Sequence, residues 1–192
     1  MDALTDQARI IRRLLRVNHS GEHGAVAIYS SQIASAQKRY PEILPWLQET
    51  LGHEVQHRAT FLDAMPSRST KPCRAMYVWK YGGALLGWIT SLFGKTGVMI
   101  CTAAVERTVH SHLVEQINFL KKHDPPLSAI VANILTEEEQ HLQTAERQHN
   151  PNSYFAKLLS SAVSLATEAL IFISTRGDSL RLRAALAQTP TP

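Results

Sequence analysis

Six carboxylate and imidazole side chains in this chain stand at spacings that suit metal binding. They are Glu22, Glu54, His57, Glu106, Glu138 and His141. Two of the glutamates begin a Glu-x-x-His motif, whose members lie three residues apart on one helix face and can bind one ion. Four carboxylates inside a helix bundle would repel one another unless cations neutralise them. One Glu from each of two helices with a Glu-x-x-His from each of two others is a recurrent arrangement for two metals, so the set predicts a di-metal site.

An internal repeat places these side chains in two equivalent units. At one constant offset along the chain the matched pairs are Glu22 and Glu106, Gln32 and Gln116, Ile33 and Ile117, Lys38 and Lys122, Pro41 and Pro125, Glu54 and Glu138, Gln56 and Gln140, and His57 and His141. Each unit is predicted to be a helix with one glutamate, a turn, and a proline-initiated helix with Glu-x-x-His. At about 1.5 Å per residue, the first helix rises about 24 Å from Glu22 to Lys38 and the next descends about 18 Å to Glu54. Two such hairpins predict a four-helix bundle with all six side chains at one level.

The ligand types favour iron. Carboxylate and imidazole ligands without thiolates suit iron or manganese better than structural zinc. The two cysteines, Cys73 and Cys101, lie far apart in the chain and form no Cys-x-x-Cys motif. This excludes a disulfide scaffold, a zinc ribbon and a rubredoxin-type iron centre. Iron is the expected metal, and manganese is the alternative.

A third Glu-x-x-His motif, Glu146 to His149, lies outside the repeat. Leu62 and Met65 stand at the equivalent positions of the first unit, and the motif adjoins a helix-ending Asn-Pro pair at 150–151. We therefore expect a surface pair that takes no part in metal binding.

Proline and glycine divide the chain into segments with helical periodicity. The expected helical segments cover residues 5–38, 41–66, 72–94, 97–122, 125–149 and 153–175. Strand signals are nearly absent, because no Asn-Gly or Asp-Gly hairpin turn separates alternating apolar runs. With 192 residues, 44% of them hydrophobic and 19% charged, the chain suits one well-cored domain. We expect an all-α domain over residues 5–176 and a loose C-terminal tail over 177–192.

The N-terminal residues and the net charge bear on where the protein is located and what it can bind. Residues 1–16 contain Asp2 and Asp6 and no continuous apolar run, so we expect no secretory signal. The formal net charge of +4 is compatible with an anionic membrane surface or RNA and proves neither.

The most apolar segment is too short to span a membrane. The longest uncharged stretch covers residues 81–94 and is bounded by Lys80 and Lys95. A spanning helix needs roughly 17–25 residues, so no true span is expected. A crossover helix over about 77–94 either inserts into one leaflet or is buried between the hairpins. The aromatic residues suited to an interface are Trp79, Tyr81 and Trp88.

The motif around the first glutamate is the most specific in the chain. It reads Arg-Val-Asn-His-Ser-Gly-Glu-His-Gly-Ala over residues 16–25, and Glu-Val-Gln-His at 54–57, Val-Glu at 105–106 and Glu-Glu-Glu-Gln-His at 137–141 accompany it. With these motifs the chain resembles the demethoxyubiquinone hydroxylases, ferritin-like di-iron enzymes of ubiquinone biosynthesis, over about residues 14–177. The resemblance implies a ferritin-like four-helix bundle of two repeated hairpins, with an apolar crossover helix and an additional C-terminal helix.

The resemblance also implies a chemistry and a location. The expected enzyme is a 5-demethoxyubiquinol monooxygenase that uses two iron ions and O₂ to hydroxylate the ring of a polyprenylated demethoxyubiquinol. It is expected to be a peripheral membrane protein, on the cytoplasmic face of the cell membrane in a bacterium or the matrix side of the mitochondrial inner membrane in a eukaryote. No glycine-rich nucleotide motif is visible, so electrons would come from a partner protein or from the quinol itself. A homo-oligomer and partners from ubiquinone biosynthesis are compatible with the sequence, and no nucleic-acid partner is expected.

Two histidines are candidates for a catalytic role beside the metals. By position, the resemblance matches His112, six residues after Glu106, to a family histidine near the metals. Helix geometry instead favours His110, which lies one turn after Glu106. Both remain candidates. Leu113 stands where some family members have tyrosine, which puts a tyrosine-dependent electron transfer in doubt.

Two other functions suit the same bundle. A tRNA-modifying hydroxylase is compatible with the mildly basic charge, although no cluster of basic and aromatic residues stands out. An iron-storage or iron-buffering protein would have a polar exterior, and the apolar stretch at 81–94 speaks against it. Membrane association favours the quinol enzyme, co-purifying RNA the second function, and large symmetric particles the third.

Overall fold

Helices make up nearly all of the described chain. The computed structural model describes residues 3–175 and residue 184. In chain order its elements are α1 (Ala3–Arg39), the 3-10 helix η1 (Pro41–Ile43), α2 (Leu44–Asp63), the 3-10 helix η2 (Pro66–Arg68), α3 (Met76–Ser91), α4 (Gly94–His123), α5 (Pro125–Arg147) and α6 (Tyr154–Thr175). No strand occurs among these residues, which confirms the all-α class. The expected tail over 177–192 lies outside the described residues, apart from residue 184.

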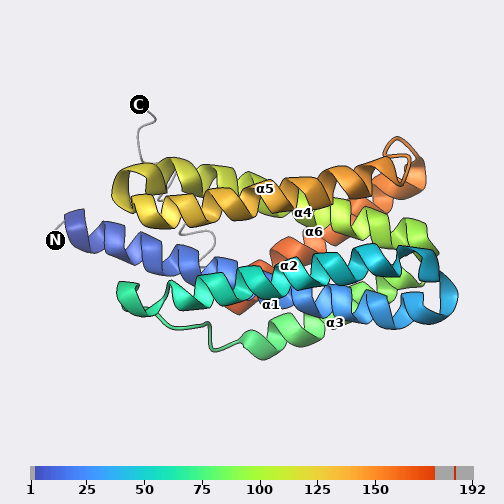
Figure 1. Cartoon of the computed structure of the whole chain (residues 1–192), viewed down its shortest axis with the longest axis horizontal. Helices are drawn as coiled ribbons and strands as arrows, with labels where there is room; N and C mark the ends of the chain where they lie inside the picture. The colour runs from blue at the N-terminus through green and yellow to red at the C-terminus, as the bar shows by residue number, and fades with distance from the viewer. Residues whose placement is uncertain (1–2, 176–183, 185–192) are drawn as a thin grey trace.

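The four long helices α1, α2, α4 and α5 form a bundle of two hairpins (Figure 1). α1 packs against α2, and α4 packs against α5, so each hairpin keeps its own two helices together. The apolar helix α3 packs mainly on α1, and α6 packs mainly on α4. The bundle of two repeated hairpins, with a crossover helix and a sixth helix, is therefore confirmed.

The repeat extends beyond the hairpins to these outer helices. Moved by the offset that relates Glu22 to Glu106, the span of α3 falls on residues 160–175 within α6. Each half of the molecule is thus a unit of three helices, two in the bundle and one outside it. Few residue identities are kept between the outer helices. They share apolar character instead, as Trp88 and Phe172 illustrate.

The two hairpin turns have nearly the same backbone. Tyr40 has φ −156° and ψ 67°, and its counterpart Asp124 has φ −156° and ψ 73°. Each precedes a proline, which disfavours the helical conformation for the residue before it and so ends the preceding helix. Proline then suits the first turn of the next helix, because it has no backbone N–H to satisfy there.

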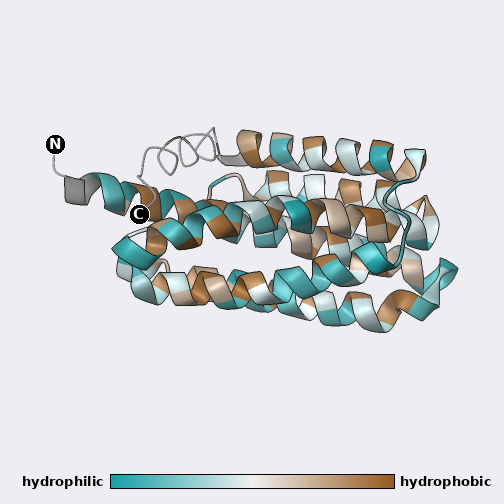
Figure 2. Cartoon of the chain, turned by 90° about the horizontal axis from the view of Figure 1, so that it is seen from above, coloured by the Kyte–Doolittle hydropathy of each residue, from teal (hydrophilic) through white to brown (hydrophobic). Residues whose placement is uncertain are grey.

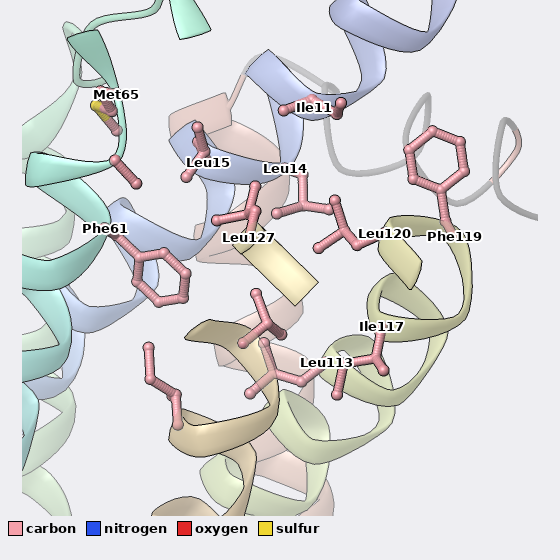
Figure 3. Close-up of a cluster of buried hydrophobic side chains, with 13 residues drawn as sticks. Ile11, Leu14, Leu15, Phe61, Met65, Leu113, Ile117, Phe119, Leu120 and Leu127 are labelled. Atoms are coloured by element: carbon pink, nitrogen blue, oxygen red, sulfur yellow. The ribbon is translucent and has the colours of Figure 1, made fainter. Parts of the chain in front are cut away.

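Apolar clusters lie on both sides of the layer that holds the six polar side chains. One cluster is drawn in Figure 3, and its largest fully buried side chains are Leu14, Leu15, Phe61, Met65, Leu113, Leu120 and Leu127. The other contains Tyr29, Leu47 and Met99. Burying each large apolar side chain stabilises the fold by roughly 1.5–3 kcal/mol. This packing holds the four helices in register around the polar layer.

Glycines let α3 approach α1 closely. A Cβ atom on Gly83 would lie 2.5 Å from the carbonyl oxygen of Gly24, and one on Gly87 would lie 2.4 Å from that of Ile28. Trp79 also packs on this contact, since a Cβ on Gly24 would lie 2.5 Å from its ring. Trp79 is only 2% exposed, so its expected place at a membrane interface is wrong. The glycine-lined contact with α1 turns this ring inward.

Candidate metal centre

The six side chains that the repeat singles out meet in one buried layer. Each is at most 5% exposed. Their ligand atoms form two groups, and within each group all of these atoms lie within 4.8 Å of one another. The first, here called the His57 position, contains Glu22, Glu54, His57 and Glu138; the second, the His141 position, contains Glu54, Glu106, Glu138 and His141. The two glutamates of the Glu-x-x-His motifs belong to both groups, where they could bridge two ions.

Helical periodicity positions each of these side chains. Glu22 lies two turns after Leu15 and two turns before Tyr29, both of which are buried on the same face of α1. Glu106 lies between buried Met99 and Leu113 on α4 in the same manner. Apolar neighbours on either side therefore force each carboxylate into the interior.

Both candidate ligand histidines direct the same ring nitrogen at the carboxylates. Nδ1 of His57 lies 3.0 Å from Oε1 of Glu138, and Nδ1 of His141 lies 3.2 Å from Oε2 of the same carboxylate. Nδ1 of His141 is also 3.5 Å from Oε1 of Glu54. The Nδ1 atoms are thus the nitrogens available to metal ions.

Electrostatics in the layer oppose a full set of negative charges. Burial raises the pKa of Glu22 and Glu106 well above the ordinary value, and the neighbouring carboxylates raise it further. Burial also acts to raise the pKa of Glu138, but its interactions with the two histidines outweigh burial and lower that pKa. Conversely, burial acts against a charged His141, but its interactions with Glu138 and Glu54 prevail and raise its pKa to about 9. Protons held by these groups compensate part of the negative charge of the cluster, and bound cations would compensate the same charge.

Two buried atoms in the cluster make no well-aligned hydrogen bond within the described part of the chain. They are Oε1 of Glu54 and Nδ1 of His57. Nδ1 of His57 lies 3.0 Å from Oε1 of Glu138 and Oε1 of Glu54 lies 3.5 Å from Nδ1 of His141, so each has a polar neighbour but no well-aligned hydrogen bond. A buried polar atom whose hydrogen bond is not made costs about 1–3 kcal/mol, which favours a better-placed partner. A metal ion is the partner that a carboxylate oxygen and an imidazole nitrogen share. The donor set therefore fits a metal at each position.

The outward sides of the ligands contact three residues that the sequence analysis did not assign to the site. Nε2 of His57 lies 2.9 Å from Oε2 of Glu137, and Nε2 of His141 lies 2.9 Å from Nδ1 of His53. The hydroxyl of Tyr29 donates a hydrogen bond of 2.6 Å to Oε1 of Glu106. The sequence contains one indication of the contacts made by residues 53 and 137, because these two positions are related by the same offset as the candidate ligands.

An apolar cavity leads to the cluster. It has a volume of about 70 Å³, and it reaches from the carboxylates to the inner sides of α3 and α6. Its wall includes Trp79 and Leu86 of α3 and Thr167, Leu170 and Ile171 of α6. The cavity thus lies between the two repeat-related outer helices.

The cavity distinguishes the two candidate histidines. His112 lines its wall with Val105 and Val109, at the helical spacing of one face of α4. The ring of His112 lies 3.5 Å from Glu168 of α6. His110 does not line the cavity, because it lies one residue beyond Val109 on another face. Which of the two histidines serves the site stays a prediction.

The third Glu-x-x-His motif lies apart from the cluster. The side chain of Glu146 is 42% exposed and pairs with Arg107, while Nδ1 of His149 lies 2.9 Å from the carbonyl oxygen of Ala145 near the end of α5. Neither belongs to the two groups of possible metal ligands found among the described residues. The structure therefore agrees with the expectation of a surface pair.

Exposed apolar side chains gather on the two outer helices. On α3 and directly after it they are Tyr77, Tyr81, Leu85, Trp88, Ile89, Leu92 and Phe93, and on α6 Tyr154, Phe155, Leu158, Leu165, Phe172 and Ile173. Hydrophobic bands follow α6, the uppermost helix in Figure 2. The rings of Phe93 and Phe155 are 5.4 Å apart, which joins the two sets. We call these residues the α3–α6 face.

The contribution of α6 to this face was not foreseen. Residues 154–173 are long and apolar enough to cross a membrane by length and composition, and most of this stretch is not buried. Lys157 and Glu168 interrupt this stretch, so a search for uncharged runs finds residues 81–94 and misses it.

Comparisons with known proteins agree with the geometry. A hydroxylase of Rhodospirillum rubrum named 3-demethoxyubiquinol 3-hydroxylase is 31% identical over 88% of this chain and 79% of its own length. A Legionella pneumophila protein of the same name is 32% identical over 85% of this chain and 76% of its own. The mouse protein named NADPH-dependent 3-demethoxyubiquinone 3-hydroxylase, mitochondrial, is 31% identical over 86% of this chain and 77% of its own.

A family model spans almost the whole helical domain. The model described as ubiquinone biosynthesis protein COQ7 matches residues 9–174, which include all six clustered side chains and nearly all of both outer helices. The expected resemblance is therefore confirmed, and with it the ferritin-like fold. The chain belongs to the COQ7 family of ubiquinone biosynthesis proteins.

Proposed function

We propose that this protein is a di-iron monooxygenase that uses O₂ to hydroxylate the ring of a polyprenylated demethoxyubiquinol. The observation that carries the proposal is the buried cluster of four carboxylates and two imidazoles at the inner end of an apolar cavity. Membership of the COQ7 family and the names of the relatives supply the substrate class.

Each part of the site has a separate task. Glu22, Glu106 and the two Glu-x-x-His motifs would hold two iron ions, which supply O₂ activation when bound. The apolar walls admit a quinol ring and exclude water from the reacting atoms. His112, in the cavity wall beside Glu168, is placed to hold or pass a proton next to the ring. Manganese suits the same ligands and is the alternative metal.

The α3–α6 face supports peripheral attachment to the membrane that holds the quinone. Exposed aromatic and aliphatic side chains from two helices make a surface larger than scattered apolar residues give. The cavity lies directly inside this face, so a tailed substrate could pass from one leaflet to the cluster without crossing water. This arrangement favours a lipid-borne quinol over the tRNA substrate or the stored iron of the two alternatives.

Complementation tests the proposed reaction. The gene is introduced into a bacterial strain that lacks its own demethoxyubiquinol hydroxylase, and the quinones are extracted and identified by mass spectrometry. Restored ubiquinone is the expected result. Continued accumulation of the demethoxy quinol, with the protein present in the membrane fraction and loaded with iron, would contradict the proposal.

A further inference from the structure

The two halves of the metal centre have different surroundings at positions that the repeat relates. Residue 53 corresponds to residue 137, and each contacts the ligand histidine of the opposite half through its Nε2 atom. Position 53 is a histidine and position 137 a glutamate. Residue 29 likewise corresponds to residue 113, and the first half has a tyrosine where the second half has a leucine.

The partner of each histidine sets how strongly its Nδ1 atom donates to a metal. An Nε2–H that donates to a carboxylate increases the basicity of the ring more than one that donates to a neutral acceptor. Glu137 is such a carboxylate, 2.9 Å from His57. His53 offers only the lone pair of Nδ1 to His141, and its ring stacks on the ring of His141 at 5.2 Å. His57 is therefore the stronger ligand.

The unshared carboxylates differ in the same sense. The hydroxyl of Tyr29 donates to Glu106 and withdraws part of the charge that this carboxylate would offer to an ion. Leu113, the counterpart of Tyr29, has no polar atom to donate to Glu22. Glu22 therefore offers more of its charge to the His57 position than Glu106 offers to the His141 position.

We propose that the two metal positions are chemically inequivalent, and that the His57 position binds its ion more tightly because Glu137 faces its imidazole. Glu137, His53 and Tyr29 are positioning residues that act through the ligands. The inference rests on the proposed function, since it takes the cluster to hold two ions. It adds an order of loading and a cause for that order.

The expected difference in metal affinity between the two positions depends on how exposed the outer partner of the histidine is. Replacing the outer partner of a metal-bound histidine typically costs about 10–100-fold in metal affinity. The side chain of Glu137 is 43% exposed, so water competes for its carboxylate. We therefore expect a difference of about tenfold between the two positions, at the lower end of that range.

Anaerobic titration of the metal-free protein with Fe(II), in competition with a ferrous chelator, measures the two affinities. Wild type should bind two ions, the first about tenfold more tightly. Glu137→Gln keeps an oxygen that accepts from His57 but loses the charge. It should therefore weaken binding of the first ion and reduce the difference in affinity between the two ions. Glu139→Gln removes an exposed charge on the same helix and is the matched control, with both steps unchanged.

His53 provides a test in the opposite direction. His53→Glu should strengthen the weaker step, because it gives His141 the kind of partner that His57 has. His53→Gln retains an acceptor and should restore the affinity that His53→Ala loses, and this pair decides the point if His53→Glu does not fold. A merely structural role predicts no gain and no rescue.

The outcomes separate the two levels of the proposal. A wild-type protein that binds no Fe(II) contradicts the proposed function itself. Two ions bound with equal affinity, or a Glu137→Gln variant that behaves like Glu139→Gln, would overturn the inequivalence and leave the di-metal centre intact.

Discussion

The hairpin of α1 and α2 and the hairpin of α4 and α5 share a backbone but not their surroundings. Both carry one glutamate on the first helix and Glu-x-x-His on the second, and the turns at Tyr40 and Asp124 have the same φ and nearly the same ψ. Around this common frame the contacts differ. Asp124 caps α5 by accepting from the backbone N–H of Leu127 at 3.1 Å, whereas the hydroxyl of Tyr40 donates to the carbonyl oxygen of Ser91.

The outer helices show the same contrast. α3 lies against the backbone of α1 through Gly83 and Gly87, but their counterparts on α6 are Thr167 and Ile171. α6 lies less closely on α4 than α3 lies on α1, and both of these larger side chains line the cavity. The repeat thus places the six candidate ligands at equivalent positions in the two halves, and divergence around them makes the surroundings of the two halves differ.

The largest expected effect comes from removing one charge from either half of the cluster. Glu106→Gln keeps the volume and most hydrogen bonds, so the helices should still pack. The metals lose an anionic ligand, so the variant should fail to restore ubiquinone and the strain should accumulate the demethoxy intermediate. Glu22→Gln should fail in the same way, because the two glutamates are equivalent in the repeat. Quinone extraction from complemented strains measures both.

The third Glu-x-x-His motif is the control for that experiment. Glu146→Gln combined with His149→Gln should complement normally, because neither side chain contacts the cluster. Full complementation by the Glu106 variant, or failure of the folded control, would show that the assignment of the site is wrong.

Membrane attachment should depend on both outer helices. Trp88→Glu with Leu92→Glu on α3, and Leu165→Glu with Phe172→Glu on α6, each place two charges where apolar side chains are exposed. Each pair should lower binding to anionic vesicles by at least roughly tenfold, and the two pairs together should abolish it.

Two glutamines on the bundle helices provide the control for added charge. Gln48→Glu with Gln140→Glu changes the net charge equally on exposed positions of α2 and α5 and should leave sedimentation with vesicles unchanged. Wild-type protein that stays in the supernatant with its native lipids would refute the interfacial role of the α3–α6 face.

The packing difference between α3 and α6 predicts unequal costs for alanine at equivalent positions. Gly83→Ala forces a methyl group against a backbone carbonyl of α1 and should cost about 1–3 kcal/mol of unfolding free energy. Thr167→Ala removes atoms that border the cavity and should cost less than about 1 kcal/mol. Urea denaturation of both variants measures the contrast, and equal costs would show that the two helices pack alike.

The smallest expected effect is the contribution of Asp124, in the turn between α4 and α5, to folding stability as the pH falls. Hydrogen bonds from Arg68 hold the pKa of Asp124 below its ordinary value. A carboxylate with a lowered folded pKa contributes stability above its unfolded pKa, about 3.8–3.9, and loses it as the pH falls through the folded value. Asp124→Asn retains the cap but should lose about 1 kcal/mol at pH 7, and this loss should shrink as the pH falls through the folded pKa of Asp124. Tyr40→Phe should show no such pH dependence.

Sequence reasoning predicted that the six candidate ligands lie together because periodicity and the repeat act along the chain. Glu-x-x-His spacing places Glu54 and His57 on one face, and the offset identifies their counterparts without any tertiary information. The prolines at 41 and 125 likewise mark both turns. Local rules of this kind also gave the helix positions to within a few residues.

Features that depend on contacts between helices could not be derived in this way. Glu137 and His53 reach ligands on the opposite hairpin, which lie far from them along the chain. The inward turn of Trp79 depends on Gly24 of another helix. The cavity that His112 lines, and His110 does not, depends on several helices together.

Metal content is the decisive measurement for the di-iron centre. The metal-free protein is equilibrated anaerobically with excess Fe(II), freed of unbound metal by gel filtration, and analysed for iron per chain. Wild type should retain two iron ions per chain, and Glu54→Ala and His141→Ala should each retain at least one fewer. Iron near zero in folded wild type, or an unchanged content in both variants, would contradict a di-iron centre built from these six side chains.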